Sequence, residues 1–285
     1  MREVDISIDN LTIMAFDTGT LSSYMADLPY IENMSSSKSF MFRNAFYCVD
    51  GTFIETGGDQ NKVRIEFNPN KASMEQIKGL LKHLKYPYLT RMDIAVDYFN
   101  YNGFDEIDWR ADGRRKRNFW EDMNGALETL YIGSQASHKQ HRIYNKLKER
   151  QDKGEVKDER ATTSHWRVEV QKRYKESDNV FDVEEYFQDE LFDIKPYRKE
   201  IDLSFISEVK ERIMVRGLLA SPGDLKELNK NTRAKYSKLI KQAREANGEA
   251  LEPTPEQVYK KKKGPLIKEL TDLFNVCSNP LVNMN

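Results

Sequence analysis

Alternating apolar and polar positions run through the first two-thirds of the chain and predict β-strands. The clearest run is 62–68, where Val63, Ile65 and Phe67 face one way and the polar residues between them face the other. Comparable patterns cover 4–16, 90–98, 128–133, 140–147 and 165–172. Because strand side chains alternate between faces, these segments predict a sheet with one apolar and one polar face.

Helical spacing appears at intervals and then dominates the end of the chain. Ser73 is placed to cap a helix whose apolar residues, from Met74 to Leu84, fall on one stripe. Segment 115–125 indicates helix or loop, and the almost wholly charged segment 148–163 indicates an exposed excursion. Four later ranges suit helices better than strands: 182–193, 204–219, 224–245 and 255–275.

This order of elements predicts an α+β protein. We expect a sheet with helices on its apolar face and an open polar face, followed by a helical C-terminal region. The pattern changes to helices beyond about residue 178, and we expect a sheet domain that covers 1–200 and a helical region that covers 201–285.

Composition narrows the class of protein. Of the 285 residues, 39% are hydrophobic and 32% charged, which is typical of a packed core under a heavily charged surface. No run of about 18 apolar residues is present to span a membrane, and the start lacks the order of a secretion signal. Cys48 and Cys277 lie far apart without a CxxC pattern, so we expect neither structural zinc nor a disulfide framework. We therefore expect a cytoplasmic protein without a membrane partner.

Charge is segregated along the chain although the formal net charge is only −1. Residues 226–244 hold seven lysines and arginines against one acid, Glu227, whereas 182–193 holds six acids and no base. A chain that separates its charges in this way can present a strongly positive face to a polyanion. The basic segment could equally be a solvated amphipathic helix.

A short motif recurs in the predicted strands, with an arginine and an acid flanking an apolar residue. It occurs as Arg64-Ile65-Glu66, Arg91-Met92-Asp93 and Arg167-Val168-Glu169, and Arg142-Ile143-Tyr144 carries a tyrosine in the acid's place. Residues two apart on a strand share a face, so the acids and the tyrosine belong to the polar face. If the four strands are neighbours, that face gathers three carboxylates beside Tyr144 and Lys146.

Three converging carboxylates repel one another unless a cation lies between them. Their hard oxygen atoms suit Mg²⁺ or Mn²⁺, and such a metal would polarise a phosphodiester. Tyr144 is the candidate nucleophile, with Arg142 and Lys146 at i−2 and i+2 to favour the phenolate. The alternatives are an ordinary packing tyrosine and ordinary cross-strand ion pairs on a solvated face. We expect His141 and His165 to be structural and to lie on the opposite face.

Five segments together resemble the Rep_trans, or replication initiation factor, family of rolling-circle plasmid replication initiators. They are VRIEFNPNK (63–71), LTRMDIAVDY (89–98), TLYIGS (129–134), HRIYNKLKER (141–150) and HWRVEVQKR (165–173). Their order and approximate spacing match over roughly residues 60–175, whereas the region before 60 matches weakly. NKNTRAKYSKLIKQ (229–242) resembles the origin-recognition segment of the plasmid members. The HxH metal motif of other rolling-circle nucleases does not occur.

The resemblance implies roles for particular residues. Tyr144 corresponds to the nucleophile within RIYNK, with Arg142 and Lys146 beside it, and Asp93 and Glu169 fall in the region of the divalent metal. Glu66 is expected to join these two ligands. The residues expected to contact origin DNA are Asn229, Lys230, Asn231, Thr232, Arg233, Lys235 and Lys238. The resemblance further implies a homodimer that recruits a host DNA helicase.

The expected function is therefore that of a strand-nicking and strand-joining enzyme. Tyr144 would cut a plasmid origin at an exposed single strand or hairpin, and the products would be a 5′-phosphotyrosine and a free 3′-hydroxyl primer. Domain 1–200 would nick and join, and 201–285 would recognise the duplex origin. Three alternatives stay open: a relaxase of a mobile element, a non-catalytic DNA-binding regulator on the same scaffold, and a hydrolytic metal nuclease.

Overall fold

The chain forms two compact units in a computed structural model that describes residues 2–28, 31–34, 41–111, 116–154, 162–175 and 182–277. The first unit comprises Met1–Asn102, Arg114–Asp193 and Pro255–Asn285. The second comprises Gly103–Gly113 and Ile194–Thr254. Each unit is described by itself below.

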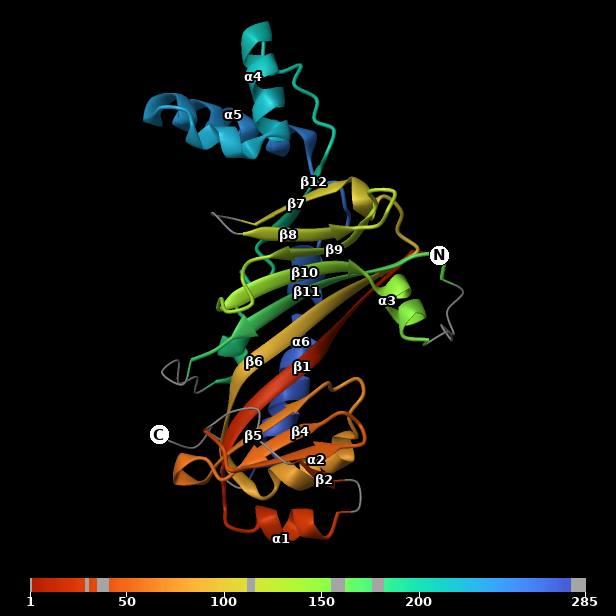
Figure 1. Cartoon of the computed structure of the whole chain (residues 1–285), viewed down its shortest axis with the longest axis vertical. Helices are drawn as coiled ribbons and strands as arrows, with labels where there is room; N and C mark the ends of the chain where they lie inside the picture. The colour runs from red at the N-terminus through yellow and green to blue at the C-terminus, as the bar shows by residue number, and fades with distance from the viewer. Residues whose placement is uncertain are drawn as a thin grey trace. The chain divides into compact units, whose positions relative to one another are not determined.

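A sheet of ten strands, antiparallel throughout, forms the first unit (Figure 1). Its spatial order is β2-β3-β4-β5-β1-β6-β11-β10-β9-β8. In chain order the strands are β1 (Glu3–Asp17), β2 (Ile31–Met34), β3 (Asn44–Cys48), β4 (Phe53–Thr56), β5 (Lys62–Phe67), β6 (Leu84–Phe99), β8 (Arg117–Glu121), β9 (Leu127–Ile132), β10 (Lys139–Asn145) and β11 (His165–Arg173).

The two long strands β1 and β6 pair with each other in the middle of this sheet. Their register shifts between Ile8 and Asn10, because β1 carries an extra residue, Asp9, at a bulge. The buried apolar positions of β1 change phase there, from Ile8 before the bulge to Leu11 and Ile13 after it. The bulge therefore lets one strand keep its apolar side chains in the core on both sides of an irregularity.

Helices cover one face of this sheet. The long helix α6 (Pro255–Phe274) packs against β1 and β6 and buries Leu266, Leu270 and Leu273, as the blue helix behind the strands shows (Figure 1). The shorter helices are α1 (Leu21–Ala26), α2 (Met74–Leu81) and α3 (Lys146–Asp152), with 3-10 turns η1 (Asp59–Asn61) and η3 (Val183–Tyr186). The face opposite α6 carries polar side chains such as Arg142 and Glu169, and α3 meets that face at the end of β10.

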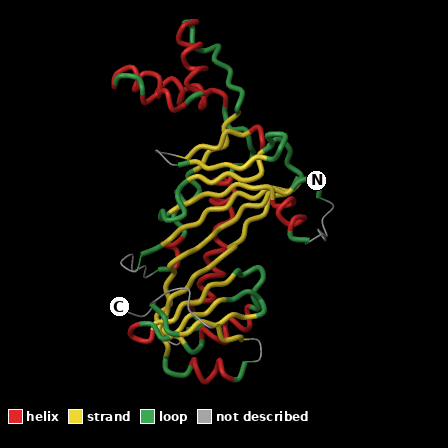
Figure 2. The backbone as a smooth tube through the Cα atoms, in the orientation of Figure 1, coloured by secondary structure: helices red, strands yellow, loops and turns green. Residues whose placement is uncertain are grey.

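The second unit combines a small sheet with helices (Figure 2). Strands β7 (Ile107–Ala111) and β12 (Ile194–Arg198) pair antiparallel, and the helices are α4 (Val209–Ala220) and α5 (Lys230–Asn247) with 3-10 turns η2 (Phe104–Glu106) and η4 (Pro222–Lys226). The helices enclose a core of their own, formed by Leu203, Ile206, Val215, Leu218, Tyr236, Ile240 and Ala243. Among the helices of the described ranges, none is long and apolar enough to cross a membrane.

The α+β prediction is confirmed, and so are the six alternating strands and the helix after Ser73. The Ser73 hydroxyl accepts a hydrogen bond from the Gln76 amide at 3.5 Å, which is the expected N-terminal cap. The prediction for 140–147 was wrong at its end, because the Asn145 side chain accepts from the Lys148 amide at 3.1 Å and starts α3 there. Lys146 consequently lies in a helical turn and not on the strand.

Two other segments form a different kind of secondary structure from the one predicted. Segment 115–125 contains the edge strand β8, and 182–193 holds only the short turn η3. The later helices begin and end a few residues from the predicted positions, whereas α6 matches 255–275 closely.

The compact units also divide the chain differently from a single boundary at residue 200. Helix α6 belongs to the first unit because its apolar stripe covers the sheet, so the range 201–285 is shared between the units. The functional division into a nicking domain and an origin-recognition region stays a prediction.

Candidate active site on the open face of the sheet

Three of the four motif-bearing strands are neighbours, in the order β6-β11-β10. Tyr144 on β10 lies opposite Arg167 on β11, which in turn lies opposite Asp97 on β6. In the adjacent row Arg142 lies opposite Glu169. Cross-strand partners share a face, so these five side chains belong to one surface, opposite the face that α6 covers.

Tyr144 is enclosed by charged side chains on this face and is only 3% exposed. Its hydroxyl lies 3.5 Å from Glu169 Oε2. The Arg142 guanidinium lies 3.8 Å from the centroid of the tyrosine ring, and Lys146 Nζ lies 5.4 Å from it. The expected neighbours of Tyr144 are therefore in place, with Lys146 reaching it from the first turn of α3.

The surroundings of Tyr144 as a whole oppose its ionisation. Burial raises the pKa of its hydroxyl and the Glu169 carboxylate raises it further, against the lowering effect of Arg167 and Arg142. Lys146 is instead paired with Glu149 at 2.6 Å. Arg142 therefore favours the phenolate as expected, but burial and Glu169 outweigh it, and an attack by Tyr144 needs a proton acceptor.

Glu169 is the acid in contact with Tyr144. It is buried and, among the residues that the structure describes, forms no ion pair within 4.0 Å. Burial and the nearby carboxylates of Asp93 and Asp9 raise its pKa to about 7. Asp93 is held by Arg91, whose Nε donates to it at 2.9 Å and whose Nη2 makes a second contact. Burial nevertheless raises the pKa of Asp93 as well.

Asp9 is a member of this cluster that the sequence reasoning missed. Its Oδ1 accepts a hydrogen bond from Arg167 Nη1 at 2.6 Å, and its charge acts on both Asp93 and Glu169. The signal that could have found it is the change of apolar phase in β1, from Ile8 to Leu11, which marks a bulge at Asp9.

Glu66 does not join the other two expected ligands. Strand β1 separates its strand, β5, from β6, and the Arg91 guanidinium stands between Glu66 and Asp93, at 3.8 Å from the Glu66 carboxylate. Within the described ranges no group of three or more His, Cys, Asp or Glu side chains is arranged to hold a metal ion. The oxygen donors of Asp93 and Glu169 do fit a hard divalent cation, because Glu169 is buried near other carboxylates and makes no ion pair with a base in the described ranges.

A second ionic network lies in the row that contains Tyr144. Arg167 Nε and Nη2 donate to the two Asp97 oxygens at 2.7 and 2.8 Å. His165 Nε2 lies 2.7 Å from Asp97 Oδ1, so the expectation that His165 faces away was wrong, whereas His141 does face the α6 side, 2.7 Å from Asp193. Residues 165, 167 and 169 are two apart on β11 and share a face, which explains why His165 lies on the same face as Arg167 and Glu169.

A pocket of about 290 Å³ opens beside Glu169. Three arginines contribute to its wall, namely Arg91, Arg142 and Arg173. Guanidinium groups present planar forks of donors that match phosphate oxygens. The pocket can therefore receive a phosphate next to Glu169, which contacts the Tyr144 hydroxyl.

The expected DNA-contacting residues lie at the start of α5 in the second unit. Asn229 caps this helix, its Oδ1 accepting from the Thr232 amide at 3.0 Å, and Arg233 donates to the carbonyl oxygens of Lys226 and Leu228 at 2.7 and 2.8 Å. Lys235 forms an ion pair with Glu211. The exposed members of the set are Asn229, Lys230, Asn231, Lys235 and Lys238. Part of the set therefore builds the helix end, and the exposed part is open to a partner.

Two known proteins that resemble this chain are both named replication initiation proteins. A replication initiation protein of Staphylococcus aureus is 31% identical over 191 residues, which cover 65% of this chain and 56% of that protein. A second S. aureus replication initiation protein is 29% identical over 256 residues, covering 84% of this chain and 76% of that protein. The chain thus spans little more than half the length of the first relative. No family model matches the chain.

Among solved structures, a rolling circle replication initiator protein from Geobacillus stearothermophilus covers 70% of this chain and 88% of its own, at 16% identity and a TM-score of 0.43. A likeness at that score supports no conclusion on its own.

Proposed function

Because the chain belongs to the Rep-type family of replication initiation proteins, we propose that it starts rolling-circle plasmid replication by cutting one DNA strand with Tyr144. The products are a 5′-phosphotyrosine and a free 3′-hydroxyl. The observation that carries the proposal is the contact of the Tyr144 hydroxyl with Glu169 Oε2, at 3.5 Å, beside a pocket lined with arginines.

The arginine-lined pocket binds the phosphate to be attacked. Arg142 is the main residue in phosphate binding, because it lines the pocket and its guanidinium lies 3.8 Å from the centroid of the Tyr144 ring. A phosphodiester that accepts hydrogen bonds from Arg142 and Arg173 would draw the guanidinium towards the pocket and uncover the tyrosine. Entry of the DNA strand would thus both supply the reacting atom and expose the nucleophile.

Proton transfer to Glu169 accompanies the attack. The Tyr144 oxygen forms a bond to phosphorus while its proton passes to Glu169 Oε2, and the bond from phosphorus to the 3′ oxygen breaks. The departing 3′ oxygen takes a proton from solvent and becomes the free hydroxyl. Since the new phosphotyrosine bond replaces the broken phosphodiester bond, the reverse reaction rejoins a strand without an energy source.

Asp93 and Glu169 are the residues that would hold a divalent cation, Mg²⁺ or Mn²⁺, with Asp9 beside them. When bound, such a cation would neutralise charge that develops on the phosphate in the transition state. Glu66 is excluded from this set by Arg91.

Origin recognition is assigned to the exposed start of α5, where Lys230, Asn231 and Lys238 face solvent. Such side chains contact phosphates for affinity and base edges for specificity. Asn229 and Arg233 serve this surface by fixing the end of the helix. A homodimer, recruitment of a host DNA helicase and a cytoplasmic location complete the proposal.

A relaxase of a mobile element would use the same chemistry, whereas a DNA-binding regulator would form no covalent product and a metal nuclease would cut without an adduct. The test is a denaturing gel of the protein mixed with Mn²⁺ and a single strand that carries the origin nick site and a label on the 3′ side of the nick. We expect label to move with the natural protein and not with Tyr144→Phe. Cleavage without labelled protein would overturn the tyrosine mechanism, and no reaction on a cognate origin would favour the regulator.

A further inference from the structure

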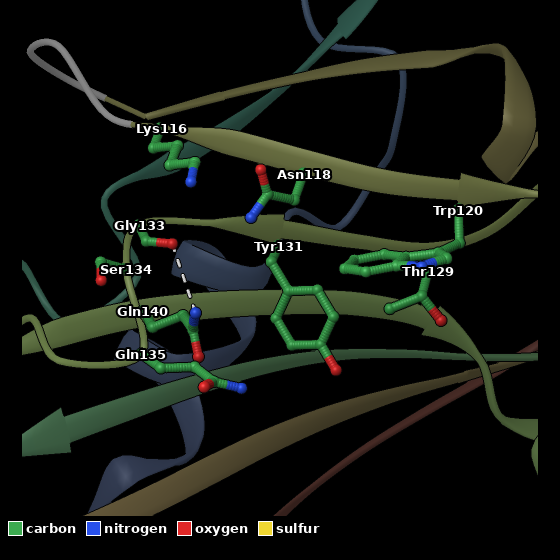
Figure 3. Close-up of a pocket in the computed structure, with 9 residues that line it drawn as sticks. All are labelled: Lys116, Asn118, Trp120, Thr129, Tyr131, Gly133, Ser134, Gln135 and Gln140. Carbon is green, nitrogen blue, oxygen red and sulfur yellow. Dashed lines mark hydrogen bonds between the residues drawn. The ribbon is translucent and has the colours of Figure 1, made fainter.

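The open face continues past Tyr144 to the sheet edge, where β8, β9 and β10 form a pocket of about 500 Å³ (Figure 3). Trp120 on β8 lies opposite Thr129 on β9, which lies opposite Tyr144 on β10. In the next row Tyr131 lies opposite Arg142. Trp120 is thus two strands from Tyr144, a separation of about 10 Å. A group bound in this pocket would lie close to the reacting tyrosine.

Two aromatic side chains in mutual contact, Trp120 and Tyr131, form one wall of the pocket. Trp120 is 53% exposed, although it is a large apolar side chain on a strand. Its ring meets Tyr131 edge to face, with centroids 5.3 Å apart and an interplanar angle of 79° (Figure 3). The Arg142 guanidinium lies 6.0 Å from the centroid of the Tyr131 ring. This wall connects an exposed indole to the arginine that covers the candidate nucleophile.

The other wall offers amide groups. The side chains of Asn118 and Gln135 line the pocket and, in the described part of the chain, make no hydrogen bond within the protein. Gln140 Nε2 donates to the Gly133 carbonyl oxygen at 3.3 Å, which orients the glutamine amide (Figure 3). Gly133 has a φ of 104°, and a Cβ there would lie 2.8 Å from the Lys139 carbonyl oxygen, so the turn requires glycine. Amide donors and acceptors therefore line the same pocket as the aromatic rings of Trp120 and Tyr131.

We propose that this pocket binds an unpaired nucleobase of the strand that Tyr144 attacks, with the base stacked on Trp120 and its edge read by the amides. The inference rests on the proposed function for the identity of the strand. A base has the flat face and the hydrogen-bonding edge that this pocket complements, and stacking on exposed aromatics is how proteins hold single strands. Paired bases are stacked inside a duplex and do not enter such a pocket. The pocket therefore selects single-stranded DNA and sets the phosphate position.

The test uses two probes of equal charge: a single-stranded dT twelve-mer and an abasic twelve-mer with the same phosphates and no bases. Fluorescence anisotropy without divalent metal measures the Kd of each for the natural protein and for Trp120→Ala. Stacking of one base is worth about 1–3 kcal/mol, so we expect Trp120→Ala to weaken dT binding roughly 5- to 150-fold. Binding of the abasic probe, and of a dT·dA duplex, should stay unchanged.

Phe119→Ala is the matched control, because Phe119 is 58% exposed on the same strand and pairs with the buried Leu130 on the other face. It should leave the preference for dT over the abasic probe intact. Equal weakening of both probes by Trp120→Ala, or the same loss in Phe119→Ala, would overturn the inference. The result is independent of cleavage: a preference for bases that depends on Trp120 without any covalent adduct would leave the pocket assigned and refute only the proposed function.

Discussion

Loss of one partner of the ion pair between Asp97 and Arg167 should destabilise the first unit strongly. Both side chains are buried, and two charged hydrogen bonds of 2.7 and 2.8 Å join them. Removing one partner of a buried pair costs about 3–5 kcal/mol because the other charge is left uncompensated. Arg167 keeps its contact with Asp9 at 2.6 Å, so for Asp97→Asn we expect the lower end, about 3 kcal/mol.

Urea unfolding at pH 7 measures this difference, with Glu256→Gln as the control. Glu256 pairs with Lys260 at the surface, so its loss should change the free energy of unfolding by less than about 1 kcal/mol. The double variant Asp97→Leu, Arg167→Met should cost less than the sum of its two single changes, because neither member of this pair is left without the other. If Asp97→Asn changed the free energy of unfolding by less than about 0.5 kcal/mol, the reasoning would be refuted, because leaving the buried Arg167 charge without Asp97 would then cost almost nothing.

The same pair predicts a pH dependence. Burial opposes ionisation of Asp97, but hydrogen bonds from His165 and Arg167 outweigh it and lower its pKa below the ordinary 3.8. A lowered acid pKa stabilises the fold above the unfolded pKa, and this stability is lost as the pH falls through the folded pKa. The advantage of the natural chain over Asp97→Asn should therefore be full at pH 6 and shrink below about pH 4.

Three further predictions concern the proposed roles. Burial and nearby acids raise the pKa of Glu169 from 4.5 to about 7. Urea unfolding without divalent cations should therefore show Glu169→Gln more stable than the natural protein by up to about 3 kcal/mol above pH 7, and this difference should fade towards pH 4.5. The same variant should form no covalent adduct. Tyr144→Phe should unfold within about 1 kcal/mol of the natural protein, because the hydrogen bond that it loses is 3.5 Å long. The variant Lys230→Ala, Lys238→Ala should weaken duplex binding and reduce its salt dependence, whereas unchanged binding in a salt titration would remove α5 from the DNA interface.

The alternation of apolar and polar residues was enough to predict the strands that carry the candidate site. It placed Tyr144, Arg142 and Glu169 on one face because side-chain direction is a local property of a strand. It could not give the order of strands, which depends on tertiary packing, and β1 separates β5 from β6. For this reason the expected role of Glu66 failed, whereas Asp93 and Glu169 came together.

Short or irregular strands were harder to predict. Strand β8 reads RNFWE, with exposed Phe119 and Trp120 on opposite faces, so its burial follows no period of two. The pairing with β9 decides its structure, and that pairing is not written in the segment itself. The pocket at Trp120 was missed for that reason, and Asp9 was missed because a bulge interrupts the period of β1.

The most direct test of the central claim is to identify the residue that carries the DNA. The covalent adduct would be digested with trypsin and nuclease and its nucleotide-bearing peptide sequenced by mass spectrometry. Cleavage after Arg142 and Lys146 yields a peptide of Ile143 to Lys146, which separates Tyr144 from Tyr131. We predict the nucleotide on Tyr144. A nucleotide on Tyr131 or on any other residue would contradict the assignment of Tyr144 as the nucleophile.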